Sequence, residues 1–339
     1  MSSNPLRLAV GLDGSLVPQA VARAAVSAEN AGFTLVTLDD STLVPGRIGA
    51  VERAAFIAAS TTTIGIAPAV PLTYAEPFHV SSQLASLDHI SLGRAGWVVS
   101  QEDRPEAARV WGRPVVEGVD ALSRESADGV DVARALWDSW EDDAVIRSVA
   151  TSRYLDRDRL HYIDFTGDTY AVKGPAIVPR PPQGQLVVLG DPRRVPADRL
   201  DVALIDGPDI ASVRETAART DTPLVFAEVE VALDTEELTG RQRAADWPEK
   251  GRLRHVGSAA GLVNLLAELR GSVDGVHLRP LSLDDDLLVL SRLVLPDLFT
   301  TRTATRPLPA ATLRTNLGLT RPANRYEDAT HSTTGKALR

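Results

Sequence analysis

Residues 62–100, TTIGIAPAVPLTYAEPFHVSSQLASLDHISLGRAGWVVS, contain a complete strand–helix–strand unit. The β-branched and apolar run at residues 62–67 predicts a strand, residues 78–87 predict a helix, and residues 93–100 hold a second strand. Strands that a helix connects in this way lie parallel, because a tight hairpin could not join them. The segment therefore predicts a parallel sheet covered by helices.

The same alternation continues on both sides of this segment and predicts eight strands in all. No linker rich in Pro, Ser or Gly divides the chain, so the strands belong to one domain. Right-handed crossovers leave chiefly a doubly wound sheet or a (β/α)8 barrel, and eight strands over about 300 residues favour the α/β (β/α)8 TIM barrel. The other predicted strands are residues 6–12, 33–38, 185–189, 202–205, 223–231 and 273–278, and the other predicted helices are residues 18–31, 48–60, 124–140 and 258–269.

Two segments fall outside the alternation. Residues 141–184 are rich in Asp, Tyr, Gly and Pro and are too long for an ordinary connection, so they predict an insertion with short strands or a functional lid. Residues 324–339 are polar and predict a frayed, disordered tail. The predicted organisation is a single barrel domain over residues 1–323, followed by that tail.

The composition excludes several classes of function. The chain has 36 basic and 45 acidic residues and a net charge of −9, which argues against nucleic-acid binding, because phosphate binding needs concentrated Arg and Lys. It has no Cys, which excludes disulfides, thiolate nucleophiles and Cys-ligated metal sites. No apolar run reaches the about 18–20 residues of a membrane span, and residues 1–6 lack the pattern of a secretory signal. We therefore expect a cytoplasmic protein without nucleic-acid or membrane partners.

The sequence motifs of dinucleotide-binding, P-loop, zincin and α/β-hydrolase chemistry are missing. The six His residues stand singly, without metal-ligand spacing, so we expect structural or surface roles for them and no metal site. Asp39 and Asp40 follow the second predicted strand, where ligands of barrels bind, although Asp also forms turns and helix caps. With Asp191, Asp40 is a candidate base for a barrel hydrolase or isomerase, the least favoured class of function.

Three further features have structural interpretations. Asp88 and Arg94 lie six residues apart around a turn, which is typical of a structural ion pair. Trp137 and Trp140 are three residues apart on a predicted helix and are expected to pack on the barrel. The acidic run at residues 141–143 is expected to form a solvated helix end.

Four long blocks of sequence carry a family resemblance. They are residues 76–100 (EPFHVSSQLASLDHISLGRAGWVVS), 136–144 (LWDSWEDDA), 158–185 (DRLHYIDFTGDTYAVKGPAIVPRPPQGQ) and 312–322 (TLRTNLGLTRP). In this order, the blocks resemble the bacterial luciferase-like monooxygenases and, more narrowly, the nitrilotriacetate and dibenzothiophene-sulfone monooxygenase branch of that family. The resemblance covers residues 6–322 and implies a (β/α)8 barrel with insertions.

This resemblance also implies a two-component monooxygenase. A separate reductase would supply reduced FMN, which together with O2 oxygenates a small organic substrate at the C-terminal mouth of the barrel. The protein would supply a dry cavity that orients the substrate. The family further implies a homodimer, or a heterodimer with a homologue.

Few of the flavin-contact positions of this branch carry its usual residues. Asp40 matches the family acid after the second strand. Ala69 replaces a Thr near the flavin, and Val98 replaces an Asn. Val119 and Ser123 stand where a His and a Tyr approach the flavin and its phosphate. Each replacement removes or weakens a hydrogen-bonding group that a cofactor pocket needs.

The turn that usually holds the flavin phosphate also differs from the family pattern. An Ala-Gly-x-Ser turn becomes Gly190-Asp191-Pro192-Arg193, in which Asp191 repels a phosphate and Pro192 lacks an N–H donor. Arg193 and Arg194 could compensate at the phosphate. Losing four or five contacts of about 1–2 kcal/mol each would lower the affinity for FMN by several orders of magnitude. Two hypotheses follow: an active FMN-dependent monooxygenase, or a flavin-free, catalytically degenerate barrel that binds a ligand or serves as a partner subunit.

Overall fold

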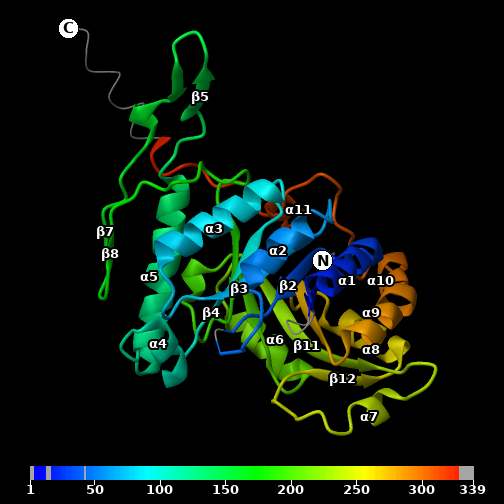
Figure 1. Ribbon diagram of the computed structural model, residues 1–339. Coiled ribbons are helices and arrows are strands. Elements are labelled where there is room, and N and C mark those ends of the chain that lie inside the picture. Colours follow the sequence, from blue (N-terminus) through cyan, green and yellow to red (C-terminus); the bar gives the residue numbers. More distant parts are fainter. Residues whose placement is uncertain (1–3, 13–16, 42, 328–339) are drawn as a thin grey trace.

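The computed structural model describes residues 4–12, 17–41 and 43–327. Eight parallel strands form a closed ring, because β10 pairs with both β9 and β11, and β13 pairs with both β11 and β1 (Figure 1). The predicted (β/α)8 barrel is confirmed, and each predicted strand overlaps one strand of the ring. In ring order, the strands are β1 (Arg7–Leu12), β2 (Leu35–Leu38), β3 (Gly65–Pro71), β4 (Gly96–Ser100), β9 (Val187–Gly190), β10 (Val202–Ile205), β11 (Leu224–Leu233) and β13 (Gly275–Pro280).

Helices cover the outside of the ring, and one further strand, β12 (Arg254–Gly257), extends the sheet beside the end of β11 (Figure 1). No helix of the described residues is long and apolar enough to cross a membrane. The helices are α1 (Pro18–Ala31), α2 (Ala50–Ala58), α3 (Pro77–Ile90), α4 (Pro105–Trp111), α5 (Val119–Asp138), α6 (Ile210–Arg219), α7 (Gly240–Arg243), α8 (Ala259–Leu269), α9 (Leu283–Val289), α10 (Leu295–Thr300) and α11 (Leu313–Leu317).

Helix α11 closes one end of the barrel. Leu313 and Leu317 belong to the apolar cluster that fills the interior, together with Leu35 and Phe226. A Cβ at Gly65 would lie only 2.5 Å from Leu313 Cδ1, so this strand position needs a glycine. The N-terminal ends of the strands, here called the floor, are therefore plugged, and the C-terminal ends, here called the mouth, remain as the place for a site.

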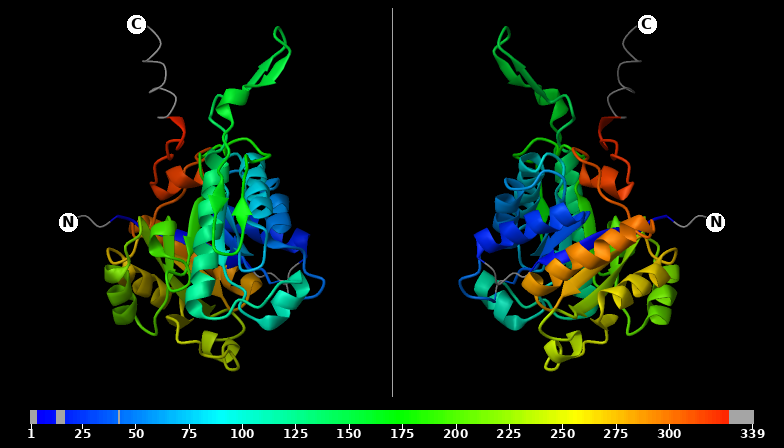
Figure 2. Two further views of the ribbon diagram at one scale, coloured as in Figure 1. Left: turned by 90° about the vertical axis from the view of Figure 1, so that its left-hand side faces the viewer. Right: turned by 90° about the vertical axis from the view of Figure 1, so that its right-hand side faces the viewer.

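The insertion between α5 and β9 forms two antiparallel hairpins, which confirms the predicted short strands. The first hairpin pairs β5 (Val145–Ser148) with β6 (Arg153–Leu155), and the second pairs β7 (Phe165–Thr166) with β8 (Ala171–Val172). Because α5 ends at the floor and β9 begins there, the insertion leaves and returns at the floor. The first hairpin projects away from the barrel, and the second lies alongside α5 (Figures 1 and 2).

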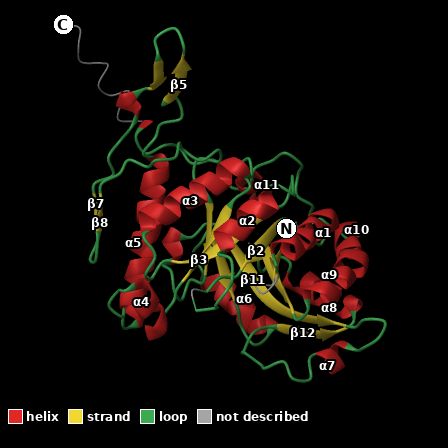
Figure 3. Ribbon diagram, in the orientation of Figure 1, coloured by secondary structure: helices red, strands yellow, loops and turns green. Residues whose placement is uncertain are grey.

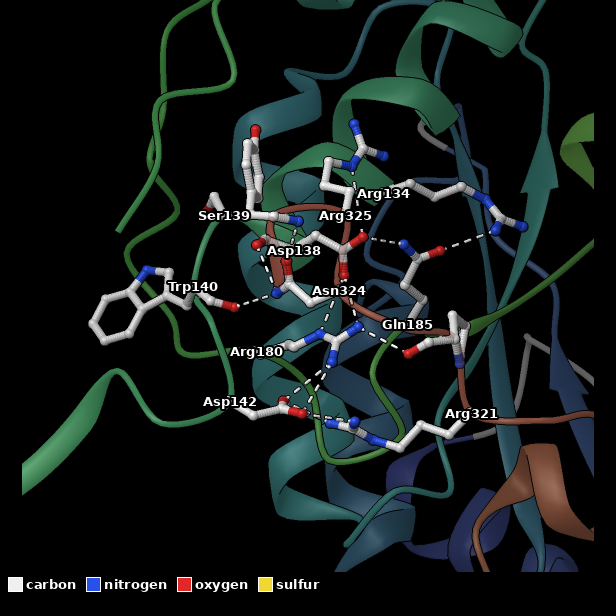
Figure 4. A network of polar contacts seen from close by, with 12 residues as sticks. Arg134, Asp138, Ser139, Trp140, Asp142, Arg180, Gln185, Arg321, Asn324 and Arg325 are labelled. Atoms are coloured by element: carbon white, nitrogen blue, oxygen red, sulfur yellow. Dashed lines mark hydrogen bonds and ion pairs between the residues drawn. The ribbon is translucent and has the colours of Figure 1, made fainter. Parts of the chain in front are cut away.

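Buried ion pairs hold the insertion and the C-terminal segment to the floor (Figure 4). The guanidinium of Arg180 lies 3.0 Å from Asp138 and 3.1 Å from Asp142, and the side chains of Arg180 and Asp138 are each 2% exposed. Arg321 donates to both carboxylate oxygens of Asp142, at 2.7 and 2.8 Å. Asn324 donates to the main-chain carbonyl of Asp138. We call these five residues the floor clamp.

Asn324 lies at the start of the predicted tail and is 3% exposed. The structure describes this segment only as far as residue 327, and the remaining residues of the predicted tail, 328–339, lie outside the described part (Figure 3).

Two structural interpretations of the sequence are wrong. Asp88 and Arg94 do not pair: Asp88 accepts hydrogen bonds from Gln183 and from the N–H of Ala95, whereas Arg94 donates to main-chain carbonyls and to a hydroxyl. The acidic helix end is not fully solvated either, because Glu141 is 4% exposed and forms ion pairs with Arg159 and His161. In both cases a residue distant in the sequence supplies the partner that a buried polar group requires.

The packing on the barrel that was predicted for the two tryptophans is confirmed for Trp137, whereas Trp140 packs against the insertion. Trp137 is 1% exposed, meets Trp97 edge to face with ring centroids 6.3 Å apart, and donates its indole N–H to a carbonyl of α3. Trp140 is 8% exposed and donates to the carbonyl of Ala176 in the insertion. Trp137 therefore joins α5 to the barrel and to α3, and Trp140, two residues beyond the end of α5, holds the insertion.

Candidate functional site at the barrel mouth

The mouth of the barrel holds a cavity of about 240 Å³. Active sites of (β/α)8 enzymes lie at this end of the barrel. The lining is mostly polar and comes from both halves of the chain. The lining residues are Thr37, Asp39, Val98, Val99, Ser100, Gln101, Asp191, Arg193, Arg194, Leu204, Glu228, Arg252, His277 and Arg279.

Strands β11 and β13 place charged side chains in the mouth. Side chains alternate between the two faces of a strand, so Glu228 points to the same side as Phe226, which fills the barrel interior. On β13, His277 and Arg279 share a face for the same reason. The two strands pair in parallel with Glu228 beside His277. A carboxylate, an imidazole and a guanidinium therefore meet at one point of the mouth.

Thr37, His277 and Glu228 form a hydrogen-bonded chain. His277 Nδ1 lies 3.1 Å from Glu228 Oε1, and His277 Nε2 lies 2.8 Å from Thr37 Oγ1. Since a carboxylate only accepts, Nδ1 carries the proton that binds Glu228. Burial opposes the charge of Glu228, but the hydrogen bond to His277 and the positive charges of His277, Arg279 and Arg252 outweigh it and lower the pKa of Glu228 to about 2. Glu228 is therefore an anion at neutral pH.

The opposite side of the mouth is also filled by ion pairs. Arg193 binds Asp191 at 2.7 Å and Asp206 at 2.9 Å, and Arg252 binds Asp206 at 3.2 Å. Arg279 lies 2.8 Å from Asp39 and 3.1 Å from Glu228. These contacts and the Thr37 chain make up what we call the mouth network: Thr37, Asp39, Asp191, Arg193, Asp206, Glu228, Arg252, His277 and Arg279.

The turn after β9 uses its own N–H groups. The N–H of Arg193 donates to the carboxylate of Asp191 at 2.9 Å, and the N–H groups of Arg194 and Val195 donate to the carbonyl of Asp191 at 2.9 and 3.0 Å. Pro192 has no N–H. None of these main-chain groups is left to bind an anion, although turns of this kind bind phosphate through them.

Three of the flavin-contact positions predicted from the sequence lie together at the mouth. Ala69 of β3 pairs with Val98 of β4, and Val98 lines the cavity. Gly190 is the last residue of β9 and pairs with Val99 of β4. Their role in binding a cofactor remains a prediction.

The other predicted positions point elsewhere. The carboxylate of Asp40 accepts from the N–H of Ser41 at 2.8 Å and from the N–H of Ala50 at 2.6 Å, which caps the start of α2. Ser123 is partly buried on α5 and does not line the mouth cavity. Val119, on the same helix, is 71% exposed.

Sequence reasoning missed the charged centre of the mouth. Glu228, His277 and Arg279 were not among the candidate residues, because His was expected to be structural and the strands were analysed for apolar content. One signal was available: Glu228 and Glu230, like His277 and Arg279, stand two residues apart within buried strands. Charges with this spacing share one face of a strand, and a buried strand tolerates them only when partners face them.

Residues 4–227 match the family model described as luciferase-like monooxygenase. This match covers more than half of the chain, so the chain belongs to the luciferase-like monooxygenase family. The resemblance inferred from the sequence blocks is confirmed. Separately, the described residues contain no group of three or more His, Asp or Glu side chains that could hold a metal ion.

Three curated relatives are similar to parts of the chain. One of the subunits of pristinamycin IIA synthase from Streptomyces pristinaespiralis is 34% identical over 219 residues, which are 63% of this chain and 73% of that protein. N-acetyl-S-(2-succino)cysteine monooxygenase from Bacillus subtilis is 36% identical over 47% of this chain and 37% of its own length. Nitrilotriacetate monooxygenase component A from Aminobacter aminovorans is 39% identical over 40% of this chain and 30% of its own length. The matches therefore span only about a third of the length of the last two.

Among solved structures, a long-chain alkane monooxygenase has the same fold. Its TM-score is 0.81 over 94% of this chain and 96% of that chain, at 15% sequence identity. The likeness extends over nearly the whole of both chains, and it supports the fold alone.

The residues of the mouth do not fit the phosphate of FMN, the flavin typical of this family. The guanidinium groups of Arg193, Arg252 and Arg279 each bind carboxylates, and the turn after β9 offers no N–H group. The cavity of about 240 Å³ is also smaller than the about 300–1,000 Å³ typical of pockets for ligands of this size. A bound dianion would have to break ion pairs that already balance one another.

Proposed function

We propose that this chain is a flavin-free barrel of a luciferase-like monooxygenase, which acts as a subunit beside a homologous barrel that holds the reduced flavin. The oxygenation of a small organic substrate, and the reductase that supplies reduced FMN, then belong to the whole assembly. The role of this chain is to bind and support the homologous subunit.

The mouth network is the observation that carries this proposal. A flavin-binding mouth needs unpaired donors for the phosphate and an open space for the ring system. Here Arg193, Arg252 and Arg279 bind carboxylates of the same network, and Asp191 occupies the phosphate turn. The network also pairs its charges within the chain, so that no ligand is needed to neutralise them.

Two further observations support a subunit role. One of the curated relatives is, by its name, a subunit of a synthase. In this chain, α2 and α3 border a groove of about 320 Å³ that is lined in part by Val51, Leu87 and Ile90, and Ile90 is 55% exposed. An apolar groove of this kind is typical of a surface that a protein partner covers.

Titration with FMN tests the proposal. We expect quenching of FMN fluorescence to give a Kd above roughly 100 µM for the purified chain, because the phosphate lacks a binding group. We also expect no NADH-dependent oxygenation when the chain is mixed with FMN and a flavin reductase. A yellow purified protein, or a Kd below about 1 µM, would show that the mouth holds the flavin after all.

The second candidate is an active monooxygenase that binds reduced FMN itself. Two polar groups at the mouth favour it. The exposed guanidinium of Arg194 lines the cavity and has no partner among the described residues. Ser100 also lines the cavity, and its buried hydroxyl has no hydrogen-bond partner among the described residues. Under this hypothesis Arg194→Ala would weaken FMN binding at least tenfold, whereas the first proposal expects no measurable change.

A further inference from the structure

A second cavity, of about 480 Å³, lies on the outer side of α5. It shares no lining residue with the mouth cavity. The tip of the β7–β8 hairpin forms one wall, since this hairpin runs alongside α5 (Figure 1). Residues 113–117, which precede α5, and Thr73 and Tyr74, which follow β3, form the other walls. The lining residues are Thr73, Tyr74, Arg113, Pro114, Val115, Val116, Glu117, Ala121, Arg124, Glu125, Asp128, Asp168 and Thr169.

One side of this α5 cavity is apolar. Tyr74, Val115, Val116 and Ala121 present carbon surface to it, and Tyr74 is held in place by a hydrogen bond from the N–H of Val116 to its hydroxyl at 3.3 Å. The volume is within the about 300–1,000 Å³ that small-molecule sites occupy. The cavity can therefore take a compact apolar body.

The other side carries a buried carboxylate without a counter-ion. Glu125 is 9% exposed, and its one hydrogen bond comes from the hydroxyl of Thr169 at 2.6 Å, so no ion pair with it exists among the described residues. Asp128 follows three residues later and faces the same cavity. Buried carboxylates in proteins are normally paired with a cation.

The arginines that line this cavity form no ion pair with Glu125 or Asp128 among the described residues, although the positive charge of Arg124 acts to lower the pKa of Asp128. Arg124 pairs with Asp168 at 3.3 Å, and Arg113 donates to the carbonyl of Tyr74. Burial together with the negative charges of Asp168 and Asp131 raises the pKa of Asp128, which shows that negative charge accumulates at this wall. A positively charged ligand would relieve the repulsion.

We infer that the α5 cavity binds a small hydrophobic ammonium compound, with the ammonium group against Glu125 and Asp128 and the apolar body against Val115 and Val116. An ammonium group would donate to both carboxylates and supply the missing charge. The inference does not rest on the proposed function, because the mouth and the α5 cavity are separate.

Three matched probes test the charge requirement: 2-phenylethylammonium, the neutral 2-phenylethanol and the anionic phenylacetate. We expect calorimetric titration to show binding of the ammonium compound and at least tenfold weaker binding of the other two. Equal binding of the alcohol, or no binding of the ammonium compound at concentrations up to about 10 mM, would overturn the inference.

Variants of α5 locate the site. Glu125→Gln keeps the shape and the hydrogen bond to Thr169 and should weaken ammonium binding at least tenfold. Asp120→Asn removes the same charge from the same helix outside the cavity, and we expect less than a twofold change. Ala121→Phe should block binding by filling the cavity, and it serves as a second variant should Glu125→Gln fail to fold by circular dichroism. Unchanged binding by either Glu125→Gln or Ala121→Phe contradicts the assignment.

Discussion

The two ends of the barrel both hold networks of arginines and carboxylates, but the networks differ in burial and in what they connect. The floor clamp is centred on Arg180 and Asp138, whose side chains are each 2% exposed, and its outer pair, Asp142 and Arg321, is 41% and 45% exposed. The clamp joins α5, the insertion and the C-terminal segment. The mouth network is more open, with Arg193 at 64% and Arg279 at 29% side-chain exposure, and it joins the ends of neighbouring strands. The floor clamp is a structural connection between elements, whereas the mouth network lies at the barrel end where (β/α)8 enzymes have their active sites.

Under our proposal, this difference explains how a chain can resemble its family strongly while its predicted flavin-contact positions carry other residues. Asp138 and Asp142 lie in the second block that carries the resemblance, Arg180 in the third and Arg321 in the fourth. Of the predicted flavin-contact positions, Ala69, Val98 and Gly190 lie at the mouth. The long matching blocks therefore indicate that this chain shares the fold of the family. Whether it binds the family's cofactor depends on the residues at the mouth.

One buried carboxylate near each end, Asp88 and Glu228, has a strongly shifted pKa, and the two shifts have opposite directions, whereas the pKa of Asp142 in the floor clamp is lowered by its hydrogen bond to Arg321. Burial near the floor raises the pKa of Asp88 to about 7, because its partners there are mainly neutral donors. At the mouth, the charges of His277, Arg279 and Arg252 lower the pKa of Glu228 to about 2 despite its burial. The positive groups around Glu228 therefore hold a carboxylate of the chain itself as the anion at the mouth.

Removing the central arginine of the floor should have the largest effect on stability. Arg180→Met leaves the buried carboxylate of Asp138 with only one guanidinium partner, the 45% exposed Arg325 at 3.5 Å, so we expect a loss of about 3–5 kcal/mol in the free energy of unfolding, measured with urea. Arg321→Met, in the same clamp but 45% exposed, is the control and should cost about 1 kcal/mol or less. If both variants lowered the free energy of unfolding by the same amount, the contribution of these ion pairs to stability would not depend on their burial.

The mouth should show its contribution in the pH dependence of stability. Glu228 has a folded pKa of about 2 against an ordinary value of 4.5, so its contribution is fully present above pH 4.5 and is lost as the pH falls toward 2. The shift corresponds to up to about 3 kcal/mol. Urea unfolding of wild type and Glu228→Gln should therefore differ most above about pH 5 and converge on acidification. A difference that stays constant with pH would show that the mouth charges do not hold Glu228 ionised.

Opening the phosphate turn should make the mouth more like a flavin site. The double variant Asp191→Gly, Pro192→Gly removes the repelling carboxylate and one of the two carboxylate partners of Arg193, releases the N–H of Arg193 and adds an N–H at residue 192. We expect FMN to bind at least tenfold more tightly than to wild type, about 1.4 kcal/mol, by fluorescence quenching. Asp198→Asn removes one exposed negative charge outside the cavity and should leave the affinity unchanged. No gain in the double variant would mean that cavity size, rather than phosphate binding, limits the mouth.

The smallest effect is expected at Asp40. Its carboxylate binds the N–H of Ala50 at the start of α2, so Asp40→Ala should lower the free energy of unfolding by about 0.5–2 kcal/mol. FMN affinity should stay within about twofold of wild type, because the side chain points at the helix. A large loss of FMN affinity in this variant would show that Asp40 contacts the flavin.

Much of the fold was predictable because its signals are local. The alternation of apolar runs and Ala-rich helical segments marks each βα unit within about 30 residues, and the count of such units leads to the barrel. The insertion was visible as a long polar stretch. The partners of Asp88, Arg94 and Glu141 were not predictable, because Gln183 lies 95 residues from Asp88 and only the closed floor brings them together.

By itself, the sequence determined the eight βα units, their order and the absence of cysteine chemistry, since these follow from periodicity and composition. Only the tertiary structure decided which charged and polar side chains meet at the mouth. Thr37 and His277 are 240 residues apart, and they meet because ring closure puts β2 and β13 on either side of β1, where Gly11 leaves space beside both side chains. Which charges neutralise one another is a property of strand register and closure, and no local pattern encodes it.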